Sequence, residues 1–429
     1  MQWQNYLITF GAALFIVSGT FLAISWAKGY RPDVKNGKLK PTGLLVANSF
    51  PTGAQVFVND KLTTATDDTL NLNPGTYRIK ISKDGFIPWE KKLKLEKELV
   101  AQTNALLFPL APDLQALTFT GAIDPDPSPD GEKMAFRIAS ASARPKNGLY
   151  VLRMSNNRMS FKTETQQLAT NASFDFTKGN LLWSPDSSQI LAYQIDKNNN
   201  IIQSVLLETN KLNPDPLASQ NLNLSLILAD WEEQVEIITK QRLEKLPDEF
   251  LEILQTKAIN PYWSPDKEKI LYTATASAVI AENLIPSLPA SSTQPENRKL
   301  EPNKTYVYDL KEDKNFQVFE NASIEIPENE IPENSRLKRI LNLRNQYSPI
   351  YTQKIQWFPN SKNLIMSETN KIASKEYDNT NEATIYARPM KNLINGNAFV
   401  FPSPDASKLI IMTSLNKDLP ANLYAIKLK

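Results

Sequence analysis

The tripeptide Ser-Pro-Asp recurs along most of this 429-residue chain, each time a fixed distance before an apolar run. The complete copies are Ser128-Pro129-Asp130, Ser184-Pro185-Asp186, Ser264-Pro265-Asp266 and Ser403-Pro404-Asp405, and a degenerate copy is Phe358-Pro359-Asn360. Five residues after the prolines stand Met134, Ile190, Ile270, Leu409 and, for the degenerate copy, Leu364. Self-similarity at a fixed offset indicates stacked supersecondary units that cannot bury their apolar faces alone.

Each copy of the motif has the composition of a tight turn between two strands. Proline is preset for the second turn position, Asp or Asn suits the third, and serine can accept a local hydrogen bond at the first. A buried-type strand follows each turn, as in Ile190 to Tyr193, and then a further strand, as in Val205 to Leu207. Five such repeats predict a β-propeller of five blades, although six are also compatible with the spacing.

The repeats from about Asp113 to the C-terminus resemble the TolB-type propeller. The last repeat ends soon after Leu423 and lacks an outer strand, whereas Leu114 to Phe119 precedes the first motif without a blade of its own. We therefore expect the segment from Leu114 to Phe119 to complete the last blade, which would remove a free sheet edge.

Three tryptophans stand at or next to the start of a motif, namely Trp183, Trp263 and Trp357. Large aromatic residues at repeated positions favour packing between blades over ligand binding, which is the alternative.

Two long insertions interrupt the repeats, near 212–258 and near 278–303. Between Ala229 and Thr256 the apolar residues follow helical spacing, and Pro247 separates two short helices; these residues are Trp231, Val235, Ile238, Phe250, Leu251 and Leu254. We expect this helical hairpin to cover an apolar blade surface, with docking of a partner as the alternative. The second insertion is rich in Pro, Ser and Asn and predicts a flexible loop, and a duplicated Ile-Pro-Glu-Asn at 326–334 predicts an extended surface loop.

The N-terminus, 1–28, is predicted to be a transmembrane anchor. From Tyr6 to Trp26 the chain is uncharged and long enough to cross a hydrocarbon core of roughly 30 Å as a helix. A cleaved signal peptide is the alternative, because Ser25-Trp26-Ala27 offers small residues for cleavage. The basic residues near the span all follow it: Lys28, Arg31, Lys35, Lys38 and Lys40. This bias favours a cytoplasmic C-terminal part.

A linker, 29–41, and a small β-domain, 42–112, are predicted next, before a propeller over 113–429. Turn and strand signals alternate through the domain, and its motifs resemble the PEGA domain, a small β-sandwich; they are Pro51-Thr52-Gly53-Ala54, Val56-Phe57-Val58-Asn59, Pro74-Gly75-Thr76-Tyr77, Gly85-Phe86 and Trp89. The resemblance implies an accessory module of envelope and surface proteins. Phe86 and Trp89 are predicted to pack in the core, with a ligand-stacking platform as the alternative.

The chain has no cysteine and no histidine, which excludes disulfides, thiolate nucleophiles, imidazole bases and the usual zinc and haem ligands. A formal charge of +2 gives no support for nucleic acid as a partner. Glycine spacing excludes G-x-S-x-G and G-x-G-x-x-G, and a P-loop is absent. Asp124, Asp126 and Asp130 form a dense cluster, but they lack the glycine and the terminal glutamate of an EF-hand. The sequence therefore predicts no catalytic residue, cofactor or metal, and it identifies no ligand-binding residue.

The predicted fold is mainly β: a transmembrane helix, a PEGA-like sandwich and a propeller carrying a helical insertion. The predicted function is a non-catalytic binding or scaffolding protein, anchored in the cell membrane with its C-terminal part outside the cytoplasm. Its predicted partner is a protein or a cell-wall polysaccharide. The alternative is a carbohydrate-active hydrolase that uses paired carboxylates in the propeller channel. An acidic pair there, with a raised pKa on one member, would favour the enzyme.

Overall fold

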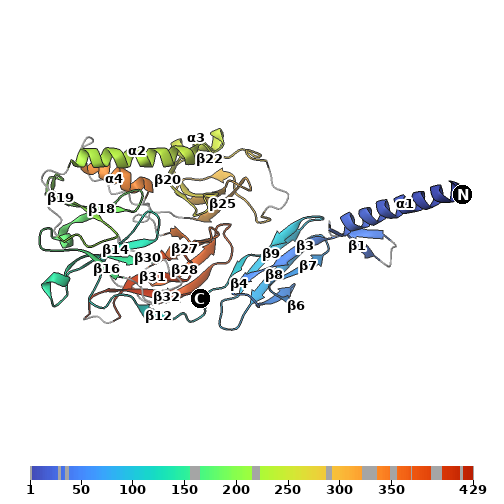
Figure 1. Cartoon of the computed structure of the whole chain (residues 1–429), viewed down its shortest axis with the longest axis horizontal. Coiled ribbons are helices and arrows are strands. Elements are labelled where there is room, and N and C mark those ends of the chain that lie inside the picture. Colours follow the sequence, from blue (N-terminus) through green and yellow to red (C-terminus); the bar gives the residue numbers. More distant parts are fainter. Residues whose placement is uncertain are drawn as a thin grey trace. The chain divides into compact units, whose positions relative to one another are not determined.

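The structure is a computed structural model, and it divides the chain into two compact units. The first is Met1–Leu110 with Ser287–Pro295, and the second is Ala111–Pro286 with Glu296–Lys429. The described residues are 2–27, 30–33, 38–154, 165–214, 223–286, 292–320, 336–347, 355–368, 370–387, 399–415 and 419–428. Strands dominate both units (Figure 1).

The first unit begins with helix α1 (Gln2–Ala27), which contains no charged residue. Thr9–Ala27 is long and apolar enough to cross a membrane. A helix of this kind serves either as a membrane anchor or as a signal sequence.

The segment expected to be a linker is instead an antiparallel hairpin of β1 (Tyr30–Asp33) and β2 (Lys38–Pro41). The guanidinium of Arg31 lies over the ring of Trp26, 4.3 Å from its centroid, and donates to the Asn71 side chain. The Tyr30 hydroxyl donates to the carboxylate of Glu98 at 2.6 Å. These contacts hold the hairpin to the end of α1 and to the sandwich that follows.

Two antiparallel-rich sheets form the sandwich. One has the order β10-β3-β7 and the other β6-β5-β8-β9, and β11 pairs with β4. The bounds are β3 (Gly43–Ala47), β4 (Ser49–Phe50), β5 (Gln55–Val58), β6 (Lys61–Ala65), β7 (Asp68–Leu72), β8 (Gly75–Ser82), β9 (Trp89–Leu95), β10 (Val100–Gln102) and β11 (Ala105–Leu106). Alternate residues of β9 are buried and exposed, as expected for a strand with one face on a core.

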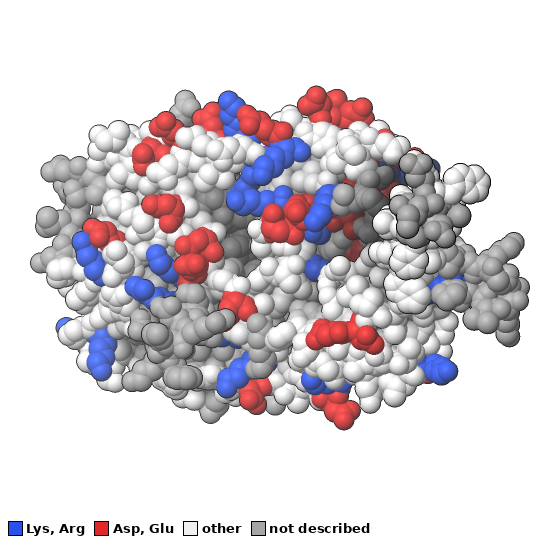
Figure 2. Space-filling view, turned by 45° about the vertical axis from the view of Figure 1, so that its right-hand side comes forward, with Lys and Arg blue, Asp and Glu red and all other residues white. Residues whose placement is uncertain are grey.

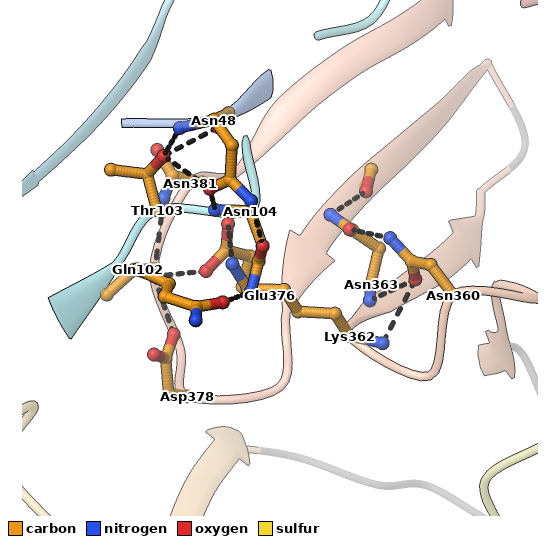
Figure 3. Close-up of polar contacts among 12 residues, drawn as sticks. Asn48, Gln102, Thr103, Asn104, Asn360, Lys362, Asn363, Glu376, Asp378 and Asn381 are labelled. Atoms are coloured by element: carbon orange, nitrogen blue, oxygen red, sulfur yellow. Dashed lines mark hydrogen bonds and ion pairs between the residues drawn. The ribbon is translucent and has the colours of Figure 1, made fainter. Parts of the chain in front are cut away.

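The core of the sandwich contains Trp89, which is 3% exposed, and Phe86 packs against it. The predicted packing role of these two aromatic residues is confirmed. Hydrogen bonds join the segment after β10 to Asn48, which lies between β3 and β4. The Thr103 hydroxyl donates to the Asn48 carbonyl at 2.6 Å, and the Asn104 amide donates to the Asn48 side chain at 2.7 Å (Figure 3). Thr103 is fully buried, so its bond to the Asn48 carbonyl satisfies a hydroxyl that water does not reach.

Five sheets of three or four strands make up most of the described part of the second unit. In each of them a copy of the motif follows an edge strand, which we call the first strand. The sheet orders are β13-β14-β15-β16, β17-β18-β19, β20-β21-β24-β25, β26-β27-β28-β29 and β12-β32-β31-β30. We call them blades 1 to 5 in chain order. The bounds are β12 (Leu114–Ala116), β13 (Ile123–Pro127), β14 (Lys133–Ile138), β15 (Gly148–Arg153), β16 (Thr165–Thr170), β17 (Asn180–Trp183), β18 (Gln189–Ile195), β19 (Ile201–Glu208), β20 (Ala258–Trp263), β21 (Lys269–Ala274), β24 (Thr305–Asp309), β25 (Lys314–Phe319), β26 (Ile355–Trp357), β27 (Asn363–Ser367), β28 (Lys371–Glu376), β29 (Ala383–Ala387), β30 (Val400–Pro402), β31 (Lys408–Thr413) and β32 (Asn422–Lys427).

The motif makes the same turn in every blade. In blade 1 the Ser128 hydroxyl lies 2.5 Å from an Asp130 carboxylate oxygen and accepts the Lys133 amide at 2.9 Å. In the degenerate copy the Asn360 side chain takes this role and accepts the Asn363 amide at 3.0 Å (Figure 3). The fourth residue of every turn has a positive φ, between 55° and 73°: Gly131, Ser187, Lys267, Ser361 and Ala406. The five apolar residues predicted to follow the turns are all fully buried.

The segment before the first motif completes blade 5, as predicted. Strand β12 pairs antiparallel with β32, with Leu114 opposite Ile426 and Ala116 opposite Tyr424. The strand is shorter than expected, since it ends at Ala116. Beyond it, the amides of Leu117 and Thr118 both donate to the Leu423 carbonyl.

Hydrophobic clusters join blade 5 to blade 1, blade 1 to blade 2, and blade 3 to blade 4. In blade 2, alternate side chains of β17 and β18 face different neighbours. Trp183 and Ile190 pack against blade 1, whereas their neighbours Leu182 and Leu191 pack against helices. Because successive side chains point to opposite faces, one sheet supports two different neighbours.

Helices occupy the junction between blades 2 and 3. They are α2 (Leu224–Leu243), α3 (Asp248–Thr256) and α4 (Arg336–Tyr347). Helices α2 and α4 run together beside blade 2 (Figure 1), and α3 packs on blade 3 through Phe250, whose ring stacks on Tyr308 at 4.0 Å. The guanidinium of Arg339 on α4 binds the Glu232 carboxylate on α2 at 2.7 and 2.5 Å.

The predicted helical hairpin is confirmed as a cover for an apolar blade surface, with three corrections. Helix α2 begins at Leu224 and is longer than expected, because Asn223 caps it by accepting the Leu226 amide. Ile238 is 39% exposed and does not belong to the core. Helix α4 was not predicted at all.

The second insertion is not a simple loop. Its ends pair as a short hairpin of β22 (Ala278–Val279) and β23 (Lys299–Leu300). The Arg298 side chain, 12% exposed, binds the Glu296 carboxylate at 3.0 Å and the Asp313 carboxylate at 3.2 Å. The duplicated Ile-Pro-Glu-Asn at 326–334 lies outside the described residues.

Candidate functional site at the converging strands of the propeller

The first strands of neighbouring blades converge. The Trp183 indole of β17 donates to the Asp126 carbonyl of β13 at 3.2 Å, and the Trp357 indole of β26 donates to the Tyr262 carbonyl of β20 at 3.1 Å. The first strand is also an edge strand of each of these sheets, and in a propeller such strands line the channel. Polar residues of these strands are the natural place to seek a site.

Asp126 is the most perturbed group on these strands. Its side chain belongs to a residue that is 5% exposed, and its Oδ1 atom has no hydrogen-bond partner among the described residues. Burial raises the pKa of Asp126 to about 7, and this rise persists although Arg344 and Arg137 favour the charged form. At neutral pH this carboxyl is thus divided between its protonated and ionised forms.

Arg137 lies in the middle of the buried strand β14 and is 5% exposed. Its guanidinium binds the Asp124 carboxylate at 2.8 Å and donates to the Gly179 carbonyl at 2.6 Å. Burial lowers the pKa of Arg137, and the two nearby aspartates oppose that change. The positive charge is retained because its partner carboxylate and a carbonyl replace water.

Blade 2 and α4 close the cluster from the other side. Tyr193 on β18 is buried, and burial raises the pKa of its hydroxyl to about 12. Arg344 on α4 acts on both Tyr193 and Asp126 electrostatically. The cluster of Asp124, Asp126, Arg137, Tyr193 and Arg344, which we call the junction cluster, therefore draws on blade 1, blade 2 and a helix.

The geometry limits what the junction cluster can do chemically. A carboxyl with a pKa near 7 has the acidity of a good general acid. Asp126 is buried, however, and the exposed carboxylate of Asp124 is engaged by Arg137. The arrangement is suited to joining the three elements electrostatically.

The acidic triplet considered as a cation site does not converge. Asp124 binds Arg137, Asp126 is enclosed, and Asp130 accepts the Ser128 hydroxyl in its turn. Among the described residues no group of three or more acidic side chains is placed to hold a metal ion.

The motif tryptophans differ in their surroundings. Trp183 and Trp357 are buried in clusters that join two blades, as predicted. Trp263 is half-buried and packs beside the cluster of blade 3 and α3, at the junction that the helices occupy. Packing between blades is thus confirmed for Trp183 and Trp357. Trp263 differs because helices stand between blades 2 and 3.

The sequence did not lead us to predict a functional role for Arg137, Tyr193 or Arg344. A charged residue within the apolar run from Met134 to Ile138 was a usable signal, because a buried strand carries an arginine only with a partner. The spacing of Leu337, Ile340 and Leu343 likewise indicates a helix with one apolar face.

Comparison with known proteins agrees with this architecture. Residues 42–108 match the PEGA domain. No curated protein matches the chain. Similar solved structures include a putative TolB from Agrobacterium tumefaciens, with 11% identity over 75% of this chain and 79% of that one, at a TM-score of 0.20. The β-propeller domain of the Trilobed protease from Pyrococcus furiosus has 10% identity over 73% and 70%, at 0.20.

An oligogalacturonate lyase from Vibrio parahaemolyticus has 8% identity over 83% of this chain and 87% of that one, at a TM-score of 0.27. Likenesses at these identities and scores carry no information about activity. The chain has an N-terminal apolar helix, a PEGA domain at residues 42–108 and five motif-bearing sheets of a propeller type. Modules of these two kinds act in general as binding or scaffolding units.

Proposed function

We propose that this protein is a non-catalytic, membrane-anchored component of the cell envelope, and that its PEGA domain and propeller hold a protein or a cell-wall polysaccharide. Helix α1 is the anchor, and the remainder of the chain lies outside the cytoplasm. The observation that carries the proposal is the internal use of the charged groups at the converging strands. The buried guanidinium of Arg137 is engaged by the Asp124 carboxylate at 2.8 Å, and the Asp124 side chain is 66% exposed.

The exposed surface fits a binding module better than a polyanion-binding protein. Basic and acidic residues are interspersed on the face shown in Figure 2, without a broad field of one sign. A surface of this kind gives no general attraction to nucleic acid and leaves recognition to local contacts.

Protease added to intact cells tests the orientation. The proposal expects every part beyond Lys40 to be digested, whereas full protection until the membrane is opened would place the C-terminal part in the cytoplasm. The basic residues that follow α1 favour a cytoplasmic C-terminal part, so the experiment discriminates between two opposite orientations. Crosslinking in intact cells, followed by identification of the attached molecule, tests the binding role. An envelope protein or glycan attached in proportion to the protein's abundance would support it.

A carbohydrate-active hydrolase is the second candidate, and the raised pKa of Asp126 favours it. Asp126→Asn is the decisive variant, because it removes the acid while preserving shape. An enzyme would lose roughly 10²-fold or more of its polysaccharide-cleaving activity, and a binding protein would keep its crosslinked partner. Asp130→Asn, in a turn of the same blade, is the matched control.

A further inference from the structure

Large apolar side chains are exposed on blades 5, 1 and 2 at positions that the topology brings to one end. They are Phe119, Ile123, Ile195, Ile202, Leu415 and Leu419. Phe119 is 82% exposed, and Leu415 and Leu419 are each 60% exposed. Single exposed apolar residues are ordinary, but a group of them on neighbouring loops indicates a contact surface.

The motif turns of these three blades lie together at one end. The Asp130 amide of blade 1 donates to the Ser187 hydroxyl of blade 2 at 3.2 Å. On the other side, a Cβ placed on Gly131 would lie 3.5 Å from the Phe401 ring and 3.9 Å from Pro404 of blade 5. Because antiparallel strands reverse at each turn, the far ends of the same strands lie at the opposite end of the blades.

The six apolar residues lie at these far ends. Ile195 and Ile201 are paired at the end of the β18–β19 hairpin, next to Ile202. Ile123 begins β13, opposite Arg137 near the end of β14. Leu415 and Leu419 lie between β31 and β32.

Contacts bring the segment that carries Phe119 to the chain between β31 and β32, where Leu415 and Leu419 lie. The Thr118 hydroxyl donates to the Asn422 side chain at 3.0 Å. A Cβ placed on Gly121, whose φ is +88°, would lie 3.2 Å from Pro420. Phe119 is thus held between two residues that touch the β31–β32 loop, and its exposed ring projects from an ordered backbone.

Basic residues border the same group. The Ser140 hydroxyl donates to the Thr120 carbonyl at 2.6 Å, which joins the Phe119 segment to the loop that follows β14. This loop carries the exposed short helix η1 (Arg144–Lys146). The Tyr150 hydroxyl donates to the Lys146 carbonyl at 2.7 Å and fixes the turn. These hydrogen bonds fix the loop that carries Arg144 and Lys146 next to the segment that contains Phe119.

We propose that this end of blades 5, 1 and 2, the lipid-facing end, rests on an anionic membrane surface. Phe119, Leu415 and Leu419 enter the boundary between headgroups and acyl chains, and Arg144 and Lys146 meet anionic headgroups. Apolar side chains beside basic ones are the composition of interfacial membrane contacts. Basic residues near an anionic surface strengthen the attraction to it.

The inference rests on the proposed anchoring by α1. A tethered domain meets the membrane at a high effective concentration, so a few inserting side chains are enough to hold it there. The same small group would give only weak binding to a chain that was free in solution.

The absence of cysteine makes the test direct. Single-cysteine variants Phe119→Cys and Leu415→Cys of the full chain, each carrying an environment-sensitive fluorophore, are reconstituted in phosphatidylcholine vesicles with and without phosphatidylglycerol. Glu132→Cys is the matched control, because Glu132 is exposed in the motif turn of blade 1, at the other end. A quencher attached to lipid should remove more than about half of the signal at 119 and 415 in the anionic vesicles, and little of it at 132.

Two further outcomes separate the lipid-facing end from the anchor. Equal, weak quenching at all three positions in a chain that resists carbonate extraction would overturn the lipid contact and leave the anchor standing. Loss of the chain on carbonate extraction would overturn both. The label at 119 could also become shielded from solvent as the protein concentration rises in detergent, without lipid. That result would overturn the proposal, since a second copy of the chain would then cover this surface. Reversing both charges, with Arg144→Glu and Lys146→Glu, should abolish the dependence on phosphatidylglycerol.

Discussion

The indole of Trp183 donates a hydrogen bond of 3.2 Å to the carbonyl of Asp126, and Trp357 donates an equivalent bond of 3.1 Å to the carbonyl of Tyr262. Each bond crosses from one blade to the preceding one, and both tryptophans occupy the residue just before a motif. The motif therefore has two roles. It forms the turn between the first two strands of its own blade, and it positions the preceding tryptophan, which bonds to the neighbouring blade.

A second bond accompanies the indole at the same junctions. The amide of the motif aspartate donates to a serine in the next turn, from Asp130 to Ser187 at 3.2 Å and from Asp266 to Ser361 at 2.9 Å. Blade 3 has Lys267 in place of this serine, and the helices fill the junction before it. A serine at the fourth position of the turn thus marks the two junctions at which this bond between blades forms.

Trp183→Phe should lower the free energy of unfolding by about 1–3 kcal/mol, because the buried carbonyl of Asp126 loses its donor while most of the aromatic packing is kept. Trp357→Phe should behave in the same way. Trp263→Phe is the control, since among the described residues its indole makes no such bond to another blade. Chemical denaturation followed by fluorescence measures all three, and equal losses at the three positions would contradict the assignment.

Asp126→Asn should change how stability depends on pH. Burial raises the pKa of Asp126 to about 7 in the folded state, above its ordinary value of 3.8. Below pH 4 the group is protonated in both states and makes no difference. Between pH 4 and 7 the unfolded chain releases the proton first, so the wild-type free energy of unfolding falls as the pH rises, by about 4 kcal/mol at most.

The neutral amide removes this slope. Asp126→Asn should match the wild type near pH 4 and exceed it at pH 8, as measured by denaturation of both proteins across that range. The other titrating groups cancel in the difference between the two. A constant difference at all pH values would show that Asp126 is not enclosed in the way described.

Ser184→Ala should cost about 1–3 kcal/mol, because the Ser184 side chain is buried and joins the Asp186 carboxylate at 2.6 Å to the Gln189 amide at 2.9 Å. Ser188→Ala in the same turn is the control, since Ser188 binds Asp186 from an exposed position. Thermal unfolding compares the two. If the exposed serine proved the more costly to remove, the motif would not work through its first residue.

Leu228→Ala should cost about 2–5 kcal/mol by leaving a cavity between α2 and blade 2, because Leu228 is fully buried there. Leu226→Ala, two residues earlier on the same helix, should have little effect, since Leu226 is 66% exposed. Hydrogen exchange of α2 and α4 measures both. Rapid exchange in α2 of the wild type would mean that the helices do not complete the junction.

Much of the fold was predictable because the signals were local. A turn needs particular residues at four successive positions, so the motif copies located all five turns and the strands that follow them. The pairing of β12 with β32 was also predictable, although its residues are some 300 apart, because an incomplete last repeat and an unassigned first strand complement one another. The core role of Trp89 followed from its place in the PEGA motifs.

The junction cluster was only partly predictable, because the arginine within an apolar run is a local signal, whereas the enclosure of Asp126 is not. The pKa of Asp126 depends on how far Tyr193, Trp183 and α4 exclude water, and no pattern near Asp126 encodes this. The acidic triplet looked like one feature in the sequence, yet the strand turns Asp124 toward Arg137 while Asp130 serves its own turn.

By itself, the sequence determined the class of architecture: an apolar helix able to span a membrane, a PEGA domain, and repeats that make five sheets. Only the tertiary structure decided that α2, α3 and α4 stand between blades 2 and 3, that Asp126 is enclosed, and that exposed apolar residues gather at the end of blades 5, 1 and 2 opposite the motif turns. The physical reason is range. Turn chemistry and strand periodicity act over a few residues, whereas burial and surface composition are set by elements that meet only when the chain has folded.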